Sequence, residues 1–183
     1  MKSWSKEEDS KYSHLYANGY PPGNPGQSMY LLKGLPADSC LDLGCGRATI
    51  STQFKYYTGV DVSEYIIGEN RKKYPDHHFI HASLDDLSGV DGLNFDVAMC
   101  CDVMEHIPES EVHSVLTSIA KVGAAQFVFA ISTRPSGILD KDGKNLHLTI
   151  WDGAKWNREI SKYLKVKACD VKGDCVFLRA VKK

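Results

Sequence analysis

The sequence predicts one α/β domain built on a seven-stranded, mostly parallel sheet, with helices on both faces and an antiparallel hairpin at its C-terminal end. From Cys40 onward, strand patterns alternate with helix patterns, which is typical of a parallel sheet that is covered on both sides. Only Lys172, Gly173 and Asp174 join the last two strand patterns. That connection is too short for a parallel crossover, so these two strands should pair antiparallel.

The predicted elements follow from these patterns in chain order. The expected strands span residues 39–43, 57–62, 78–81, 95–101, 125–132, 165–171 and 175–181. The expected helices span residues 7–15, 27–32, 47–54, 64–73, 109–121 and 152–164. A run rich in Pro and Gly over residues 19–26 separates the first two helices, because it breaks helices on both sides and cannot form a central strand.

Composition is that of a folded protein with little net charge. The 183 residues suffice for one domain, and 43% are hydrophobic while 25% are charged. The formal net charge is -1, from 22 Lys and Arg against 23 Asp and Glu. This balance argues against a protein that binds nucleic acid by broad phosphate neutralisation, and it leaves a local basic patch open.

Targeting features and cysteine spacing indicate a cytoplasmic protein. The N-terminus lacks the apolar core of a signal peptide, and no apolar run is long enough to span a bilayer, so we expect no membrane partner. The cysteines lack C-x-x-C spacing and fall mostly inside expected strands, which predicts small buried thiols. They are Cys40, Cys45, Cys100, Cys101, Cys169 and Cys175.

A glycine turn follows the first expected strand. Gly44 and Gly46 remove the side chains that would block a close approach of a nucleoside to the backbone. Asp61 ends the second expected strand, where a carboxylate can accept hydrogen bonds from both hydroxyls of a ribose. A dinucleotide site would need a third small residue three positions after the second glycine, and Thr49 stands there.

Three motifs in series carry a family resemblance. They are Leu-Asp-Leu-Gly-Cys-Gly over 41–46, Gly-Val-Asp-Val-Ser over 59–63, and the stretch from Phe95-Asp96-Val97 to Glu105-His106-Ile107. Together they resemble the class I S-adenosylmethionine-dependent methyltransferases, over about residues 36–182. The resemblance implies a Rossmann-like domain over residues 36–183 that binds S-adenosylmethionine and releases S-adenosylhomocysteine. It also implies that residues 1–35 form a lid or cap over the cofactor.

The resemblance assigns cofactor contacts position by position. The turn that faces the amino acid part and the ribose would comprise Asp42, Gly44, Cys45 and Gly46. Asp61 would hold the ribose hydroxyls and Val62 would stack on the adenine. Ser83, with the backbone N–H of Leu84, stands where the family often has an acid that accepts from the adenine amino group, and Asp85 is the alternative acceptor. Cys101 would lie beside the transferable methyl.

Methyl transfer needs alignment of the acceptor with the methyl, and a hydroxyl acceptor must also lose its proton. A histidine or carboxylate near the methyl is therefore expected. His147, at the end of a long irregular segment after the fifth strand, is the favoured base. Asp102 is a second catalytic candidate, and His106 is expected mainly to support the site.

A metal site is a further possibility. Asp102, Glu105 and His106 have a D-x-x-E-H spacing that resembles the E-x-x-E-H metal site of some methyltransferases that act on small RNA ends and quinone precursors. His147 would be the fourth ligand. Mg or Mn bound there would polarise a hydroxyl of the substrate. The residues leave metal binding open.

The favoured function is methyl transfer to a small hydroxylated acceptor, with oxygen preferred over nitrogen. After the fourth strand, the sequence lacks the Asn/Asp-Pro-Pro-Tyr/Phe motif of methylation on base amino groups. Two alternatives stay open. An RNA-modifying methyltransferase would use the metal-like residues and a few lysines, and a non-catalytic module would only bind the cofactor, as the departure at Ser83 allows.

Overall fold

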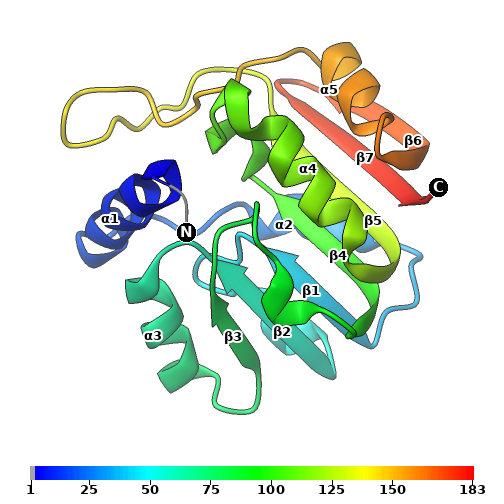
Figure 1. The fold of residues 1–183 in the computed structure, drawn as a ribbon, viewed down its shortest axis with the longest axis horizontal. Coiled ribbons are helices and arrows are strands. Elements are labelled where there is room, and N and C mark those ends of the chain that lie inside the picture. Colours follow the sequence, from blue (N-terminus) through cyan, green and yellow to red (C-terminus); the bar gives the residue numbers. More distant parts are fainter. Residues whose placement is uncertain (1–2) are drawn as a thin grey trace.

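Seven strands form a single sheet in the computed structural model, which describes residues 3–183. Across the sheet the order is β3-β2-β1-β4-β5-β7-β6, and β7 runs in the direction opposite to the other six strands (Figure 1). The strands are β1 Ser39–Leu43, β2 Tyr56–Asp61, β3 His78–His81, β4 Asn94–Cys101, β5 Gly123–Ser132, β6 Leu164–Lys172 and β7 Cys175–Lys182. The predicted sheet and its terminal hairpin, in which Lys172 pairs with Cys175, are confirmed.

The helices also follow the expected order. They are α1 Ser3–Ala17, α2 Pro25–Leu32, α3 Glu64–Lys73, α4 Val112–Lys121 and α5 Gly153–Ile160, with short 3₁₀ turns η1 Ser51–Gln53, η2 Ser88–Val90, η3 Met104–His106 and η4 Glu109–Glu111. The side chains of Asn24, Ser63 and Asp152 cap the N-termini of α2, α3 and α5. Each cap accepts from a backbone N–H that has no partner within the helix.

Two helix predictions were wrong in extent. The helix expected over 47–54 is a series of turns with only the short η1, and Ala48 has a φ of 50°, a left-handed conformation that an α-helix cannot contain. The helix expected over 152–164 ends at Ile160, because the chain turns there before β6 begins at Leu164.

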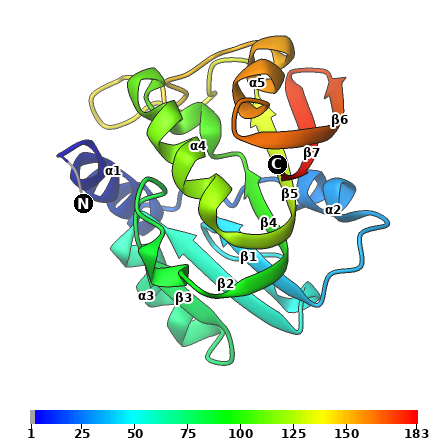
Figure 2. The ribbon, with the colours of Figure 1, turned by 45° about the vertical axis from the view of Figure 1, so that its right-hand side comes forward.

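Each face of the sheet has its own apolar core. On one face, α4 buries Val112, Val115, Leu116 and Ile119, a stripe at helical spacing, and α5 buries Trp156 against Trp151. On the other face lie Leu31 of α2 and Ile67 of α3. Figure 2 shows α4 and α5 together on one side of the strands, with α2 on the other. This arrangement confirms the prediction of helices on both faces.

The order of the strands places a crevice at the carboxyl edge of the sheet. The sequence order reverses between β1 and β4, and in open parallel sheets ligands bind outside the carboxyl ends at such a point. Helix α1 lies at this edge, where it contacts the last residue of β3 and residues that follow β1, β2 and β4 (Figure 1). None of the helices among residues 3–183 has the length and apolar character needed to cross a bilayer.

Candidate active site

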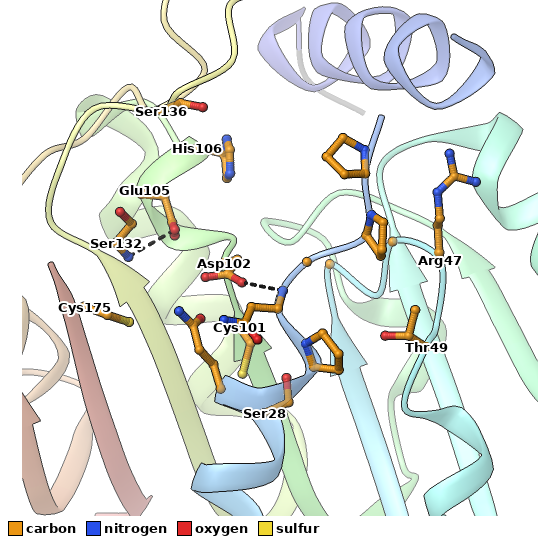
Figure 3. Close-up of a pocket in the computed structure, with 18 of the residues that line it drawn as sticks. Ser28, Arg47, Thr49, Cys101, Asp102, Glu105, His106, Ser132, Ser136 and Cys175 are labelled. Carbon is orange, nitrogen blue, oxygen red and sulfur yellow. Dashed lines mark hydrogen bonds between the residues drawn. The ribbon is translucent and has the colours of Figure 1, made fainter. Parts of the chain in front are cut away.

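A cavity of about 680 Å³ opens at the carboxyl edge, beside the ends of β1, β4 and β5 (Figure 3). Its walls come from the glycine turn, the Pro-rich segment before α2, the 3₁₀ turn η3 and the long loop after β5. Most of the site residues expected from the sequence line it. They are Asp42, Gly44, Cys45, Gly46, Cys101, Asp102, His106 and His147.

A second, smaller cavity of about 90 Å³ lies under α1 and shares part of its wall with the larger one. The remaining expected residues, Asp61, Val62, Ser83 and Leu84, line it. Apolar side chains of Val103 and Ile107 complete the wall below α1. The two cavities together have the mixed lining, apolar at one end and polar at the other, that suits a nucleoside with an attached polar group.

Asp61 holds the glycine turn through its carboxylate. One oxygen, Oδ2, accepts from the backbone N–H of Gly46 and the other, Oδ1, accepts from that of Ser63, each at 2.9 Å. Burial raises the pKa of Asp61 above its ordinary value, while these two hydrogen bonds lower it. Each oxygen keeps a further lone pair that can accept from a ligand hydroxyl.

Both glycines of the turn are needed for packing as well as for backbone conformation. Gly44 has a φ of 80°, and a Cβ there would lie 2.4 Å from Cγ2 of Val103. Gly46 has a φ of 48°, and a Cβ there would lie 2.8 Å from the Tyr16 hydroxyl. Tyr16 of helix α1 therefore packs against the turn at Gly46. Val103, the residue before η3, packs against Gly44.

Asp42 lies under the turn rather than in the open part of the cavity. It is buried, and the Tyr57 hydroxyl donates to its Oδ2 at 2.6 Å. Burial raises the pKa of Asp42 to about 6. The carboxyl thus anchors the end of β1 to β2, next to the backbone that faces the cavity.

Ser83 and Asp85 do not face the smaller cavity together. Ser83 lines it, but its hydroxyl donates to Asp85 Oδ1 at 2.5 Å. Asp85 itself lines a separate surface pocket with Asp86 and His113. The structure therefore leaves the smaller cavity without a carboxylate from the segment that follows β3.

Asp102 sits at the end of β4 in a strained conformation. Its φ of 55° is rare for a residue with a side chain, and its Oδ2 accepts from the backbone N–H of Asn24 at 3.2 Å. The neighbouring Cys101 is a protonated thiol, because burial raises its pKa far above the ordinary value. Asp102 thus holds the Pro-rich segment against the end of β4, and Cys101 contributes an uncharged side chain to the cavity wall.

Glu105 is a buried carboxyl with one oxygen unpaired. Its Oε1 accepts from the backbone N–H of Ser132 at 3.0 Å, and among the described residues its Oε2 has no hydrogen-bond partner (Figure 3). Burial raises the pKa of Glu105 to about 8. A buried carboxyl oxygen without a hydrogen bond destabilises a folded protein, so Oε2 of Glu105 is a candidate to bind a ligand or an ion.

Two histidines stand beside Glu105. The ring centroids of His106 and His147 are 4.8 Å apart and the rings are perpendicular. His147 Nδ1 donates to the carbonyl of Arg134 at 2.6 Å, which leaves Nε2 of a neutral ring with its lone pair free of that bond. Burial lowers the pKa of His106 to about 3, so its ring is neutral, and its Nδ1 lies 2.7 Å from the Tyr12 hydroxyl.

The backbone of Glu105 brings the long loop to this place. Its carbonyl accepts from the N–H groups of Leu148 and Thr149, at 2.7 and 3.0 Å. His147, the preceding residue, is thereby fixed against η3. One ligand atom from each of Glu105, His106 and His147 lies within 4.8 Å of the other two, and Asp102 is not in this group of three.

Sequence reasoning missed the part of the site that α1 supplies. Trp4, Glu8, Tyr12 and Tyr16 line the smaller cavity, and Arg47 donates to the carbonyls of Tyr16 and Tyr20. The sequence signal that could have found these four residues is their four-residue spacing, because side chains at i, i+4 and i+8 share one face of a helix.

Comparison with known proteins finds a family model that matches part of the chain. Residues 40–125 match a family model described as "Methyltransferase domain". The match spans slightly less than half of the chain. It runs from β1 into β5, so it includes the glycine turn, Asp61, Glu105 and His106, but neither α1 nor His147.

Two curated relatives share the name "Ubiquinone biosynthesis O-methyltransferase". The protein of Hahella chejuensis is 25% identical over 114 residues, which are 57% of this chain and 48% of the relative. The protein of Aromatoleum aromaticum is 31% identical over 87 residues, 42% of this chain and 36% of the relative. The chain thus spans less than half the length of these two relatives.

Solved structures share the fold at low sequence identity. The 1,6-didemethyltoxoflavin-N1-methyltransferase of Burkholderia thailandensis, solved with its substrate and S-adenosylhomocysteine, has a TM-score of 0.74 at 15% identity, over 98% of this chain and 89% of that one. The N-methyltransferase NodS of Bradyrhizobium japonicum, in complex with S-adenosylhomocysteine, has a TM-score of 0.61 at 14% identity, over 86% and 84%. These likenesses show that the chain shares the fold of these proteins.

Proposed function

We propose that this protein is an enzyme that transfers the methyl group of S-adenosylmethionine to a hydroxyl oxygen of a small acceptor. The match of residues 40–125 to a methyltransferase domain and the two relatives named as O-methyltransferases support this proposal. The observation that carries it is the group formed by Glu105, His106 and His147 on the wall of the larger cavity. Such a group can bind and deprotonate a hydroxyl, which an oxygen acceptor needs.

In this proposal, the two cavities hold different parts of the cofactor. The ribose hydroxyls would donate to Asp61, and the adenine would enter the smaller cavity between Val62 and Leu84. The amino acid end would lie along the backbone from Gly44 to Gly46, in the larger cavity. The methyl would then face the end of β4 and the space in front of the histidines.

His147 is the proposed general base. In the reaction, a bond forms between the acceptor oxygen and the methyl carbon, the bond between that carbon and sulfur breaks, and the hydroxyl proton passes to Nε2 of His147. The sulfonium becomes the neutral thioether of S-adenosylhomocysteine. His106 is a poor proton acceptor because its pKa is lowered to about 3, and it is assigned instead to orienting the acceptor.

The same three residues fit a divalent cation, in an alternative arrangement in which Nε2 of His147 binds the ion and does not accept the hydroxyl proton. Glu105 Oε2 is buried without a partner in the described chain, and neutral imidazoles are metal ligands. One carboxylate with two imidazoles suits Mn or Zn better than the oxygen-rich Mg site. A bound cation would polarise the acceptor hydroxyl and lower its pKa. Asp102, the further ligand expected from the sequence, would act instead through its bond to the Asn24 backbone.

The test is methyl transfer from S-adenosylmethionine with a labelled methyl to a panel of phenols, catechols, sugars, amines and a short RNA. We expect product only with hydroxylated small molecules. His147→Ala should lower turnover at least a hundredfold while S-adenosylhomocysteine affinity changes less than threefold, because a general base contributes about 10²–10⁴ in rate. His78→Ala is the matched control, since His78 is exposed on β3 and lines neither cavity.

Product with amines alone, or equal turnover in His147→Ala and the unaltered chain, would contradict the proposal. Transfer to RNA with strong salt dependence would favour the RNA-modifying alternative. Binding of S-adenosylhomocysteine with no transfer to any acceptor class would favour the non-catalytic alternative.

A further inference from the structure

The adenine end of the proposed cofactor site has no carboxylate from the segment that follows β3. The exocyclic amino group of adenine is a donor and needs an acceptor when buried. The hydroxyl of Ser83 donates to Asp85 and offers only a neutral oxygen as an acceptor, and Asp85 itself lines a different pocket. Asp86, the next acid, is exposed and accepts from its own loop at Ser88.

Helix α1 supplies polar groups to the same cavity. Trp4, Glu8, Tyr12 and Tyr16 recur at four-residue spacing and all line it, opposite Val62 and Leu84. Helical geometry places such a series on one face, so α1 turns a continuous stripe toward the cavity. A second stripe, one residue further along, attaches the helix to the domain. It comprises Asp9, which pairs with His81 and accepts from the N–H of Glu64, and Ser13, which bonds Ser63.

Glu8 is the carboxyl best placed for the adenine end. The other carboxyls that line this cavity are Asp61, which holds the glycine turn, and Asp102, which lies at the end of β4. The Glu8 side chain is 13% exposed, and its two oxygens lie 2.7 and 2.6 Å from Lys11 Nζ, one turn along the helix. Each carboxylate oxygen has a further lone pair, so the ion pair with Lys11 fixes Glu8 and still leaves it able to accept.

Trp4 offers a donor beside that acceptor. Its indole Nε1 is buried and has no hydrogen-bond partner among the residues that the structure describes. A buried N–H without a partner is uncommon in a finished fold, because it costs free energy. Adenine presents an amino donor next to ring nitrogens that accept, which matches a carboxyl and an indole N–H on one helix face.

We propose that α1 recognises the adenine of S-adenosylmethionine, with Glu8 accepting from the exocyclic amino group and the Trp4 N–H donating to a ring nitrogen. The proposal rests on the cofactor named under the proposed function. It makes the N-terminal helix part of the cofactor site and the source of its base specificity. The usual acid after β3 is then dispensable in this chain, and Ser83 serves to hold its own loop.

The test compares calorimetric titrations of the full chain with S-adenosylhomocysteine and with S-inosylhomocysteine, in which a carbonyl oxygen replaces the amino group. The unaltered chain should prefer the adenosyl compound at least tenfold, because the inosyl oxygen faces the Glu8 acceptor. In Glu8→Gln the side-chain amide can donate to that oxygen, so the preference should fall at least fivefold. Trp4→Phe should weaken binding of S-adenosylhomocysteine by about five- to tenfold.

Glu7→Gln is the matched control, because Glu7 is exposed on the same turn of α1 and does not line the cavity. It should keep the preference of the unaltered chain. If Glu8→Gln keeps that preference while both proteins bind S-adenosylhomocysteine, the assignment of Glu8 is overturned and the proposed function stands. If the folded, unaltered chain binds neither compound, both the proposed cofactor and this inference are refuted.

Discussion

The Asp61 carboxylate stabilises the fold even without a ligand. Its two carboxylate oxygens accept from the N–H groups of Gly46 and Ser63, which lie on the turns after β1 and β2. In Asp61→Ala both buried donors lose their partner. We expect the free energy of unfolding to fall by about 1–3 kcal/mol and S-adenosylhomocysteine affinity to fall at least tenfold, measured by chemical denaturation and calorimetry.

The control for that change is Asp86→Ala, because Asp86 is exposed and bonds only within its own loop among the hydrogen bonds described. It should leave both quantities unaltered. Unchanged ligand affinity in Asp61→Ala would contradict the assignment of Asp61 to the ribose.

Glu105 should make stability depend on pH in a defined window. Its pKa is about 8 in the folded protein against an ordinary value of 4.5, so the folded state binds the extra proton between these values. Stability contributed by the neutral form is therefore lost as pH rises toward 8. The pKa of His106 is lowered from 6.5 to about 3, so its effect on stability has the opposite sign. Stability contributed by the neutral His106 ring is lost only as pH falls below 6.5.

Between pH 6.5 and 8 the effect of Glu105 can thus be measured with little overlap, since Asp42 titrates lower, at about 6. In the presence of a chelator, the free energy of unfolding should fall by about 1–2 kcal/mol across this window. Glu105→Gln should abolish most of the fall. An equal fall in the variant and the unaltered chain would show that another group titrates.

At the scale of elements, α1 is attached to the sheet edge by few but specific contacts. Arg47 follows the glycine turn, and its guanidinium donates to the carbonyls of Tyr16 and Tyr20 at 2.9–3.3 Å. The same guanidinium lies 5.5 Å from the centroid of the Tyr16 ring. Arg47 therefore joins the end of α1 to the turn that would hold the cofactor.

We expect Arg47→Ala to loosen α1 and leave the sheet intact. Amide hydrogen exchange over residues 3–20 should become at least tenfold faster, because three hydrogen bonds and a cation–π contact are lost. Exchange in β4 and β5 should not change. Arg158→Ala, an exposed arginine on α5, is the control and should leave α1 unaltered. Equal protection of α1 in Arg47→Ala would refute this role.

Element boundaries were predictable where local chemistry decides them. Ser63 and Asp152 precede helices as capping residues, and the short connection after Lys172 forces an antiparallel hairpin. The segment after Gly46 was predicted as a helix, but there Arg47 bonds α1 and Ala48 turns left-handed. Those constraints come from a distant segment, which single-sequence periodicity does not report.

At the scale of the whole molecule, the motifs predicted the half of the site that lies on the sheet. The glycine turn and His106 follow strands and Asp61 is the last residue of β2, so strand order alone brings them to one edge. The other half depends on how α1 and the long loop fold back. His147 reaches the site because two backbone N–H groups bond the Glu105 carbonyl, and Glu8 reaches it through the placement of α1.

The most direct test of the proposed function is calorimetric titration of the purified chain with S-adenosylhomocysteine, in parallel with NAD, each with and without Mn. We predict binding of S-adenosylhomocysteine at one site per chain and no heat with NAD. A further heat with Mn that Glu105→Gln abolishes would support the metal assignment. Absence of S-adenosylhomocysteine binding by the folded chain, or tight binding of NAD, would contradict the proposed function.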